Sequence, residues 1–201
     1  MDRERGLAGR LKRAPTWLRG GLVLGGAVAV PLAAALLMPR ADLEVLSPGR
    51  AMVAAGLLSV LAIVGAALAV RPMHVRAVST TALIALASIA SATFAGLALF
   101  PAGLDPVPQP SDTLLVGVVR CGMGVLGVAA IVFALARAAR RDVPGEVVGA
   151  VALAALSGYG ALGAVCPIDD LAHLVLGHAL PAMLLVLAGL WAHVRPRGRT
   201  A

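Results

Sequence analysis

The sequence predicts an all-α membrane protein with six transmembrane helices and with both termini in the cytoplasm. Three observations lead to this fold class: the composition, six apolar runs of similar length, and the uneven distribution of basic residues. Hydrophobic residues make up 60% of the 201 positions and charged residues only 13%. A soluble domain of this size needs more polar side chains than that to cover its surface.

Each apolar run is close to the ~20 residues that an α-helix needs to cross about 30 Å of hydrocarbon. The predicted spans are about 20–38, 51–70, 81–100, 114–135, 147–165 and 171–192. A basic tail, 1–19, precedes them, and a second tail, 193–201, follows. The first run is long for the apolar part of a secretory signal and is predicted to be retained.

The fourth span leaves two alternatives open, because Arg120 and Cys121 lie inside its apolar run. In one, the helix begins near Leu114 and the arginine side chain reaches outward to the membrane surface. In the other, 114–119 lies at the interface and the span begins after it.

The orientation of the spans follows from the basic residues. The two tails and the connections 71–80 and 136–146 carry 14 of the 17 Lys and Arg residues. The other three connections, with the start of the fourth span, carry three Arg and six of the ten acidic residues. The positive-inside rule therefore places the first set in the cytoplasm.

Direct binding of nucleic acid is not expected, although the net charge is +7. The basic residues form short clusters at the ends of apolar runs, which is the pattern of a topology signal. Aromatic residues, which would stack on bases, are only 3% of the chain, and no nucleic-acid-binding motif is present.

The predicted topology places both cysteines, Cys121 and Cys166, at the outer side of the membrane. Cys166 is followed by four polar side chains: Asp169, Asp170, His173 and His178. Thiolate and imidazole groups are ligands for transition metals, and an outer thiol of low pKa suits redox sensing. The two thiols could also form a disulfide in an oxidising compartment. Metal binding at Cys121, Cys166 and His173 is thus one of three functional interpretations, and the alternative is that both cysteines are small hydrophobic residues without a function.

The aspartates and histidines also have simpler interpretations. Asp169 and Asp170 are explained as solvated turn residues that obey the charge rule. His173 and His178 are about 140° apart on an ideal α-helix, so they need not face the same group. His178 would lie ~10 Å below the outer surface, where a polar side chain needs a partner.

The stretch 166–178, Cys-Pro-Ile-Asp-Asp-Leu-Ala-His-Leu-Val-Leu-Gly-His, resembles the terminal signature of the NrsF-like family of membrane anti-sigma factors. Members are six-span proteins of about this length, with a Cys-Pro turn before the last span. Softer matches are the basic tail that leads into Trp17, the Ala-Asp-Leu at 41–43, and the second cysteine at the start of span four.

This resemblance implies a regulator in the bacterial cytoplasmic membrane and not an enzyme. Cys121 and Cys166 become the sensor thiols, and the short tail becomes the binding surface for an extracytoplasmic-function sigma factor. That surface would include Arg3, Arg5, Leu7, Leu11 and Trp17. Leu7 and Leu11 are four residues apart, which places them on one face of a helix. Alternatively, the basic tail binds anionic membrane lipid.

Two other functions compete with the regulator. A small transporter or metal-handling protein would use the same polar residues, but the spans otherwise contain few ionisable groups. A rhomboid-type intramembrane protease would use Ser157 with a histidine. The residue two before Ser157 is Ala155, where that family has glycine, and no oxyanion donor is evident.

Overall fold

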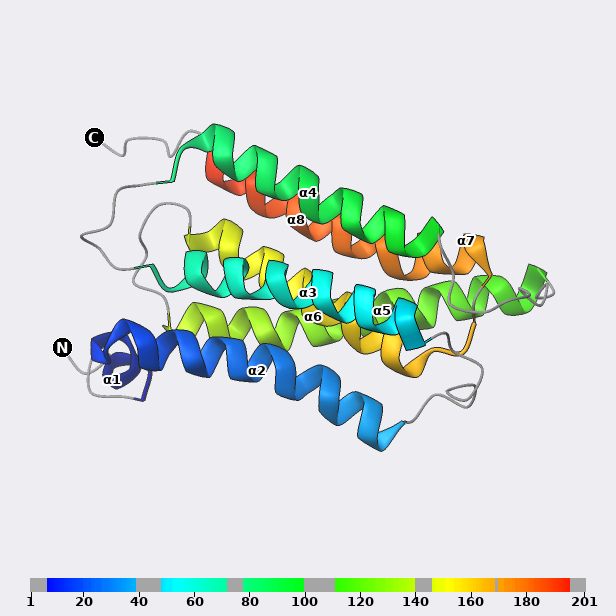
Figure 1. The fold of residues 1–201 in the computed structure, drawn as a ribbon, viewed down its shortest axis with the longest axis horizontal. Coiled ribbons are helices and arrows are strands. Elements are labelled where there is room, and N and C mark those ends of the chain that lie inside the picture. Colours follow the sequence, from blue (N-terminus) through cyan, green and yellow to red (C-terminus); the bar gives the residue numbers. More distant parts are fainter. Residues whose placement is uncertain are drawn as a thin grey trace.

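The computed structural model describes residues 7–38, 48–71, 78–99, 111–139, 146–168 and 170–195, and all regular structure within these ranges is helical (Figure 1). The helices are α1 (Leu7–Arg13), α2 (Thr16–Leu37), α3 (Pro48–Ala69), α4 (Thr80–Leu99), α5 (Ser111–Ala139), α6 (Glu146–Val165), α7 (Leu171–His173), the π-helix η3 (Leu174–Ala179) and α8 (Leu180–Val194). The segments α7, η3 and α8 follow one another without a break.

Six of these helices are long and apolar enough to cross a membrane, counting Leu171–Val194 as one. This confirms the predicted all-α fold with six candidate spans, and each helix overlaps one predicted run. α2 begins at Thr16, four residues before the predicted start, so that Trp17 and Arg19 lie in its first turns. α5 continues through Arg120 without interruption, which agrees with a helix that begins at or before Leu114.

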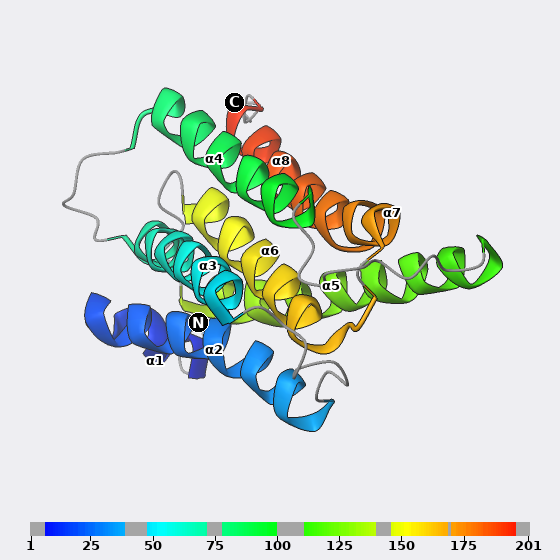
Figure 2. The ribbon, with the colours of Figure 1, turned by 45° about the vertical axis from the view of Figure 1, so that its right-hand side comes forward.

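Helix α6 lies at the centre of the bundle. It contacts α2, α3, α5 and α8, while α4 packs mainly on the outer side of α8 (Figure 2). Within the span windows, 67% of α6 is buried, compared with 11–39% for the other five helices. The large apolar side chains on those five helices are widely exposed, as expected for helices that face lipid.

Small residues explain why α6 can take the central position. A Cβ added at Gly149 would lie 2.5 Å from the Cβ of Leu68 on α3. One added at Gly158 would lie 2.5 Å from the carbonyl oxygen of Val125 on α5. Glycine at these two crossings lets the backbones approach as closely as helix packing in membranes requires.

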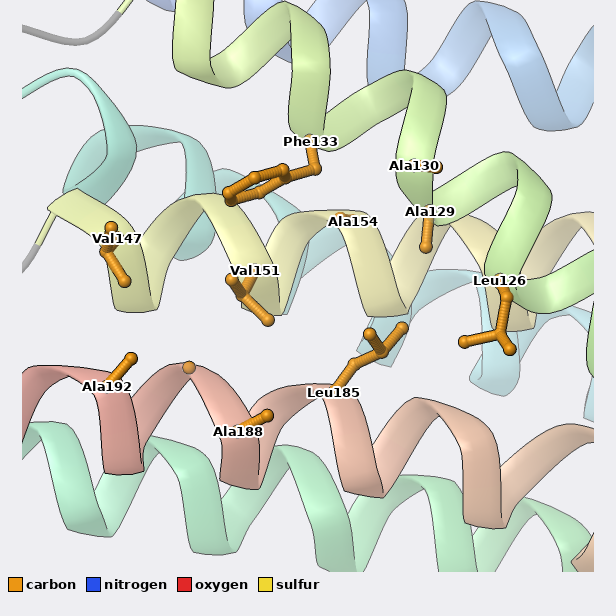
Figure 3. A pocket seen from close by; sticks show the side chains of 11 residues that line it. Leu126, Ala129, Ala130, Phe133, Val147, Val151, Ala154, Leu185, Ala188 and Ala192 are labelled. Atoms are coloured by element: carbon orange, nitrogen blue, oxygen red, sulfur yellow. The ribbon is translucent and has the colours of Figure 1, made fainter.

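An apolar cavity of about 390 Å³ opens between α5, α6 and α8 (Figure 3). Its walls are alanine, leucine and valine side chains, with Phe133 and Gly189. No titratable side chain is among the described residues that line it.

Candidate metal centre

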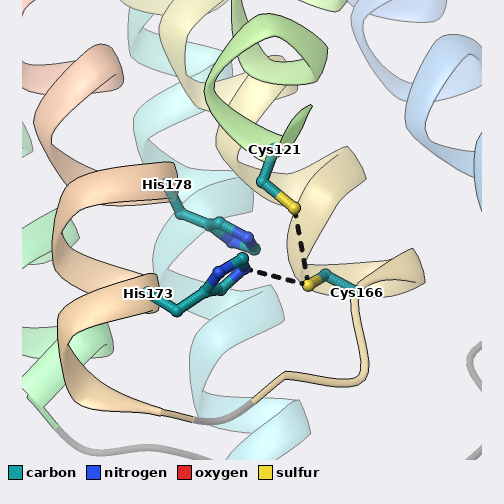
Figure 4. Close-up of side chains that lie close together, drawn as sticks. All are labelled: Cys121, Cys166, His173 and His178. Atoms are coloured by element: carbon teal, nitrogen blue, oxygen red, sulfur yellow. Dashed lines mark hydrogen bonds between the residues drawn. The ribbon is translucent and has the colours of Figure 1, made fainter. Parts of the chain in front are cut away.

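Four side chains with metal-binding atoms meet at one end of the bundle (Figure 4). Cys121 comes from α5, Cys166 follows the last residue of α6, and His173 and His178 come from α7 and η3. One potential ligand atom from each residue lies within 4.8 Å of every other. The structure thus brings together residues as far as 57 positions apart in the chain.

The closest contacts centre on the sulfur of Cys166. The Cys121 Sγ lies 3.6 Å from the Cys166 Sγ. The Nε2 of His173 lies 3.2 Å from the same sulfur. The two imidazole rings meet edge to face, with centroids 5.2 Å apart. Both sequence-predicted sensor thiols and both histidines therefore belong to one cluster.

The expectation that the histidines need not face the same group assumed an ideal α-helix, and here that assumption is wrong. Residues Leu174–Ala179 form a π-helix, in which the amide of Leu180 bonds to the carbonyl of Val175, five residues earlier. A turn closed by such a bond holds more residues than an α-helical turn, so residues five apart lie closer to one face than they do in a regular α-helix. His173 and His178 are separated by this interval, so their rings point to the same place.

Proline explains the π-helix at this position. Pro181 has no amide hydrogen to bond with the carbonyl four residues earlier, and its ring would press on that carbonyl. A wider turn before the proline relieves the clash and leaves the span able to continue as α8. The local chemistry of the chain therefore supports the register that aligns the two imidazoles.

Glycines on the facing helices make room for the cluster. A Cβ at Gly117 of α5 would lie 3.1 Å from Nδ1 of His173. A Cβ at Gly177 would lie 3.3 Å from the Cα of Val118 and 3.5 Å from the Cβ of Cys121. Helix α5 and η3 thus approach each other closely enough for thiol and imidazole groups from both sides to touch.

The histidines are buried polar groups that are only partly satisfied by protein partners. His173 is 0% and His178 2% exposed. Within the described residues, Nδ1 of His173 and Nε2 of His178 are buried and make no hydrogen bond. Tyr159 packs edge-on against His178, and Phe94 packs against Tyr159. An unpaired buried nitrogen is costly, and a bound cation would satisfy it.

Of the two thiols, Cys166 is the one whose pKa is lowered. A hydrogen bond from the Cys121 thiol holds the pKa of Cys166 far below its ordinary value, and hydrogen bonds from His173, His178 and the Ile168 backbone add to this effect. Burial opposes the shift but does not cancel it. A thiolate is the form of cysteine that binds metals and attacks oxidants.

Of the other predicted polar partners, Asp170 is described and does not belong to the cluster. Asp170 caps the following helix, because its carboxylate accepts a hydrogen bond of 3.0 Å from the amide of His173. It therefore fixes the backbone that carries a ligand. Asp169 lies outside the described residues, as do Arg3 and Arg5 of the predicted tail surface.

In the described part of the tail, Leu7 and Leu11 lie on α1 as the four-residue spacing indicated. Leu11 packs against a buried cluster of the bundle that includes Ala139. Trp17 is 76% exposed. The structure does not describe the side chain of Leu7.

A second cavity gives access to the sulfurs. It has a volume of about 820 Å³ and is lined by residues that include Met38, Arg120, Cys121, Cys166 and Pro167. Arg120 is exposed, so its charge lies at the open side of this cavity. Metal ions or small oxidants could reach the thiols by this route.

Ser157 has a structural partner in this fold. Its hydroxyl lies 2.9 Å from the carbonyl oxygen of Leu153 and 3.1 Å from that of Ala27, to which it can donate. The second contact joins α6 to α2. The histidine rings that a serine protease would need are instead engaged around Cys166.

Sequence reasoning missed three buried charges, Arg19, Arg71 and Glu146, of which Arg19 is the most enclosed. Arg19, assigned to the basic tail by its position, is 0% exposed. Its guanidinium donates to the carbonyl oxygen of Ala139 at 2.8 Å and to that of Val70 at 3.4 Å. No sequence signal separates this arginine from the solvated ones near it, because its partners are backbone atoms of distant helices.

The four-residue set matches the chemistry of a tetrahedral metal site. Two thiolates and two imidazoles are a common ligand set for Zn²⁺ and suit other metals with affinity for sulfur. Four protein ligands complete a tetrahedral shell and leave no open position for a substrate, as is usual for sites that bind an ion without catalysis. Comparison of the chain with protein-family models, with curated proteins and with solved structures found no match.

Proposed function

We propose that this chain is a membrane-bound anti-sigma factor that senses a sulfur-binding metal ion, or oxidation of the same thiols, at the Cys121–Cys166–His173–His178 centre. In the resting state it holds an extracytoplasmic-function sigma factor at the bacterial cytoplasmic membrane. The observation that carries the sensing role is the convergence of four ligand atoms within 4.8 Å. The anti-sigma role is supported by the resemblance of the stretch 166–178 to the NrsF-like signature.

The geometry of the centre favours sensing over catalysis or transport. Binding of a divalent ion would neutralise the Cys166 thiolate, displace the remaining thiol proton and take one imidazole nitrogen of each histidine as a ligand. Because the ligands come from three separate segments of the chain, an ion would tie those segments together. Such a change in helix packing is a physical basis for a signal.

The proposed orientation has both termini in the cytoplasm and the metal centre outside. It is supported by the 14 of 17 basic residues that cluster on one set of connections and tails. With this topology the part of the basic tail that precedes α2, 1–15, faces the compartment in which a sigma factor is found. The same tail would also bind anionic lipid.

The metal half of the proposal is tested with the purified protein in lipid nanodiscs. Co²⁺ bound by two thiolates and two imidazoles should give the intense visible absorption of tetrahedral cobalt, together with sulfur-to-metal charge transfer. C121S, C166S, H173A and H178A should each lose or shift these bands. H193A is the matched control, because His193 lies at the other end of the same span. Unchanged spectra in all four ligand variants would contradict the site.

The partner half is tested by copurification from the native host. A tagged protein should bring down a sigma factor from unstressed cells and release it after the cells receive excess Zn²⁺ or a thiol oxidant. Deletion of 1–13 removes the tail but spares α2, which begins at Thr16, and should abolish capture. Full-length protein that captures no sigma factor would refute the regulator.

A metal transporter is the second candidate, and the same ligand cluster favours it. Against a transport path, the buried polar side chains among the described residues are few: Arg19, Arg71, Glu146, Ser157, His173 and His178. Arg19, Arg71 and Glu146 lie at helix ends on the side of the bundle opposite the metal centre. Uptake of Zn²⁺ into sealed vesicles that depends on Cys166 would favour transport over regulation.

A further inference from the structure

We propose that Arg19 couples the position of α5 to the N-terminal tail and acts as a latch, so that occupation of the metal centre releases α1 from the bundle. This inference rests on the proposed metal-sensing function and names its transmission device. Two contacts at the inner end of α5 carry it, one made by Arg19 and one by α1.

Arg19 ties together the ends of three helices. It lies in the second turn of α2, and its Nη1 donates to the carbonyl oxygen of Ala139, the last residue of α5. Its Nη2 donates to the carbonyl of Val70, just after α3, and to the hydroxyl of Thr16. Carbonyls at helix C-termini carry partial negative charge, so a guanidinium between two of them is held electrostatically as well.

The tail helix is docked beside this latch. α1 contacts α5, and Leu11 packs against the buried cluster that contains Ala136 and Ala139. Only two residues, Ala14 and Pro15, connect α1 to α2, and the chain bends at Ala14. Any movement of the end of α5 therefore acts on Arg19 and on the docking surface of α1 together.

One continuous helix joins the latch to the metal centre. Cys121 and Ala139 both belong to α5, 18 residues apart in the chain. At 1.5 Å per residue this corresponds to about 27 Å. Figure 1 shows α5 running from the end of the bundle where α7 lies to the end where α1 lies. A helix of this length moves largely as a rigid rod, so a displacement of one end also moves the other end.

A tetrahedral metal ion would draw the ligand atoms of the cluster closer together. Bonds of ~2.3 Å to sulfur and ~2.0 Å to nitrogen in a tetrahedral site put the ligand atoms about 3.3–3.8 Å apart. The ligand atoms of the cluster are spread over as much as 4.8 Å. An ion would therefore draw the ligand atoms together by up to roughly 1 Å at the widest pair, and α5 carries one of these four ligands. Shifts of this size are enough to switch packed interfaces.

The direction of the coupling follows from the latch distances. At 3.4 Å, the bond from Arg19 to Val70 is already longer than the usual 2.7–3.2 Å range. If the end of α5 moved away, Arg19 would either lose its bond to Ala139 or follow α5 and lose the long bond to Val70, so metal binding and the latch would oppose each other. Because coupling between two sites is reciprocal, loss of the latch must strengthen metal binding by the same factor.

The first experiment measures Zn²⁺ affinity in nanodiscs by competition with a chromophoric chelator. R19Q should bind Zn²⁺ about 10-fold more tightly than the wild type, and R19K, which keeps the charge but not the planar fork, should lie between them. R10Q is the matched control, since Arg10 is an exposed cation on α1, and its affinity should equal that of the wild type.

The second experiment needs no variant at Arg19, which guards against a fold damaged by the substitution. Hydrogen–deuterium exchange of the amides in 7–15 is measured with and without Zn²⁺. In the wild type, Zn²⁺ should speed this exchange by about the same 10-fold factor, and in C121S/C166S it should have no effect.

The outcomes separate the latch from the function it rests on. If the wild type binds Zn²⁺ but its tail exchange is unchanged, the latch is refuted and the metal centre stands. An R19Q affinity equal to or weaker than that of the wild type, in a folded protein, refutes it equally. If no Zn²⁺ binds, the metal centre fails and the latch fails with it.

Discussion

The most direct test of the metal centre is the substitution G117A, which adds a single methyl group. Gly117 lies on α5 opposite His173 and takes no part in metal binding itself. In G117A the new Cβ would lie 3.1 Å from Nδ1 and 3.2 Å from Cε1 of the imidazole. Ordinary van der Waals contact begins at 3.4 Å. The ring or the helix must therefore yield by about 0.3 Å.

That displacement is large for a metal ligand. Metal–ligand distances in proteins hold to within about 0.2 Å of their preferred values, so a 0.3 Å shift strains the bond to His173. Changes that misplace a ligand through its surroundings usually reduce metal affinity 10- to 100-fold. We expect G117A to bind Zn²⁺ about 10-fold more weakly than the wild type, which corresponds to about 1.4 kcal/mol.

The assay is chelator competition in nanodiscs, with G127A as the control. Gly127 lies on the same helix, and a Cβ there would meet nothing within 4 Å. G127A should therefore keep the wild-type affinity, although both variants make the same change in helix propensity. Equal Zn²⁺ affinity in G117A and the wild type would refute the arrangement of His173 around the ion.

Three further predictions follow from other contacts. Because its pKa is lowered, Cys166 should react with iodoacetamide as fast at pH 6 as at about pH 8.5. An ordinary thiol, in contrast, reacts nearly tenfold more slowly for each pH unit below its pKa of about 8.5. C121A should restore this pH dependence, and mass spectrometry of the labelled peptide measures both rates. G149A should lower the free energy of unfolding in detergent by about 1–3 kcal/mol, because its Cβ would lie 2.5 Å from a side chain of α3. In the same unfolding assay G160A, whose Cβ would meet its nearest neighbour at an ordinary 3.8 Å, should change stability little. S157A should cost only about 0.6 kcal/mol, the average for a hydrogen bond between membrane helices, and should leave Zn²⁺ affinity unchanged.

Hydropathy alone was enough to predict the number and approximate position of the apolar helices. It could not predict which helix lies at the centre. α6 has the lowest mean hydropathy of the six spans, 1.7, and is nevertheless the most buried. Lipid and protein interior are equally apolar, so hydropathy does not distinguish them. The glycines at 149 and 158 carry that information, but only when their neighbours are known.

The candidate site was partly visible in the sequence. The two thiols and His173 were predicted together, because their residue types suit a metal and the topology puts them on one side. The placement of His178 depended on an ideal helix, which Pro181 and the π-helix before it rule out. Arg19 could not be found from sequence, since backbone carbonyls from other helices are partners that no motif records.

The orientation of the side chains in the last span depends on the number of residues in its π-helical turn. Compared with a regular α-helix, one turn of this span holds an additional residue, and that residue turns the second imidazole toward the first. Deleting one residue between His173 and His178 would leave all four ligands in the chain and permit a regular α-helix. The two rings would then be four residues apart and still on one face, and the residues after the deletion, Pro181 and the buried Ala182 included, would keep their orientation relative to α7, because the wider turn already absorbs the additional residue. The wide turn thus lets this span contain one more residue than a regular α-helix without changing the packing of the helix beyond it.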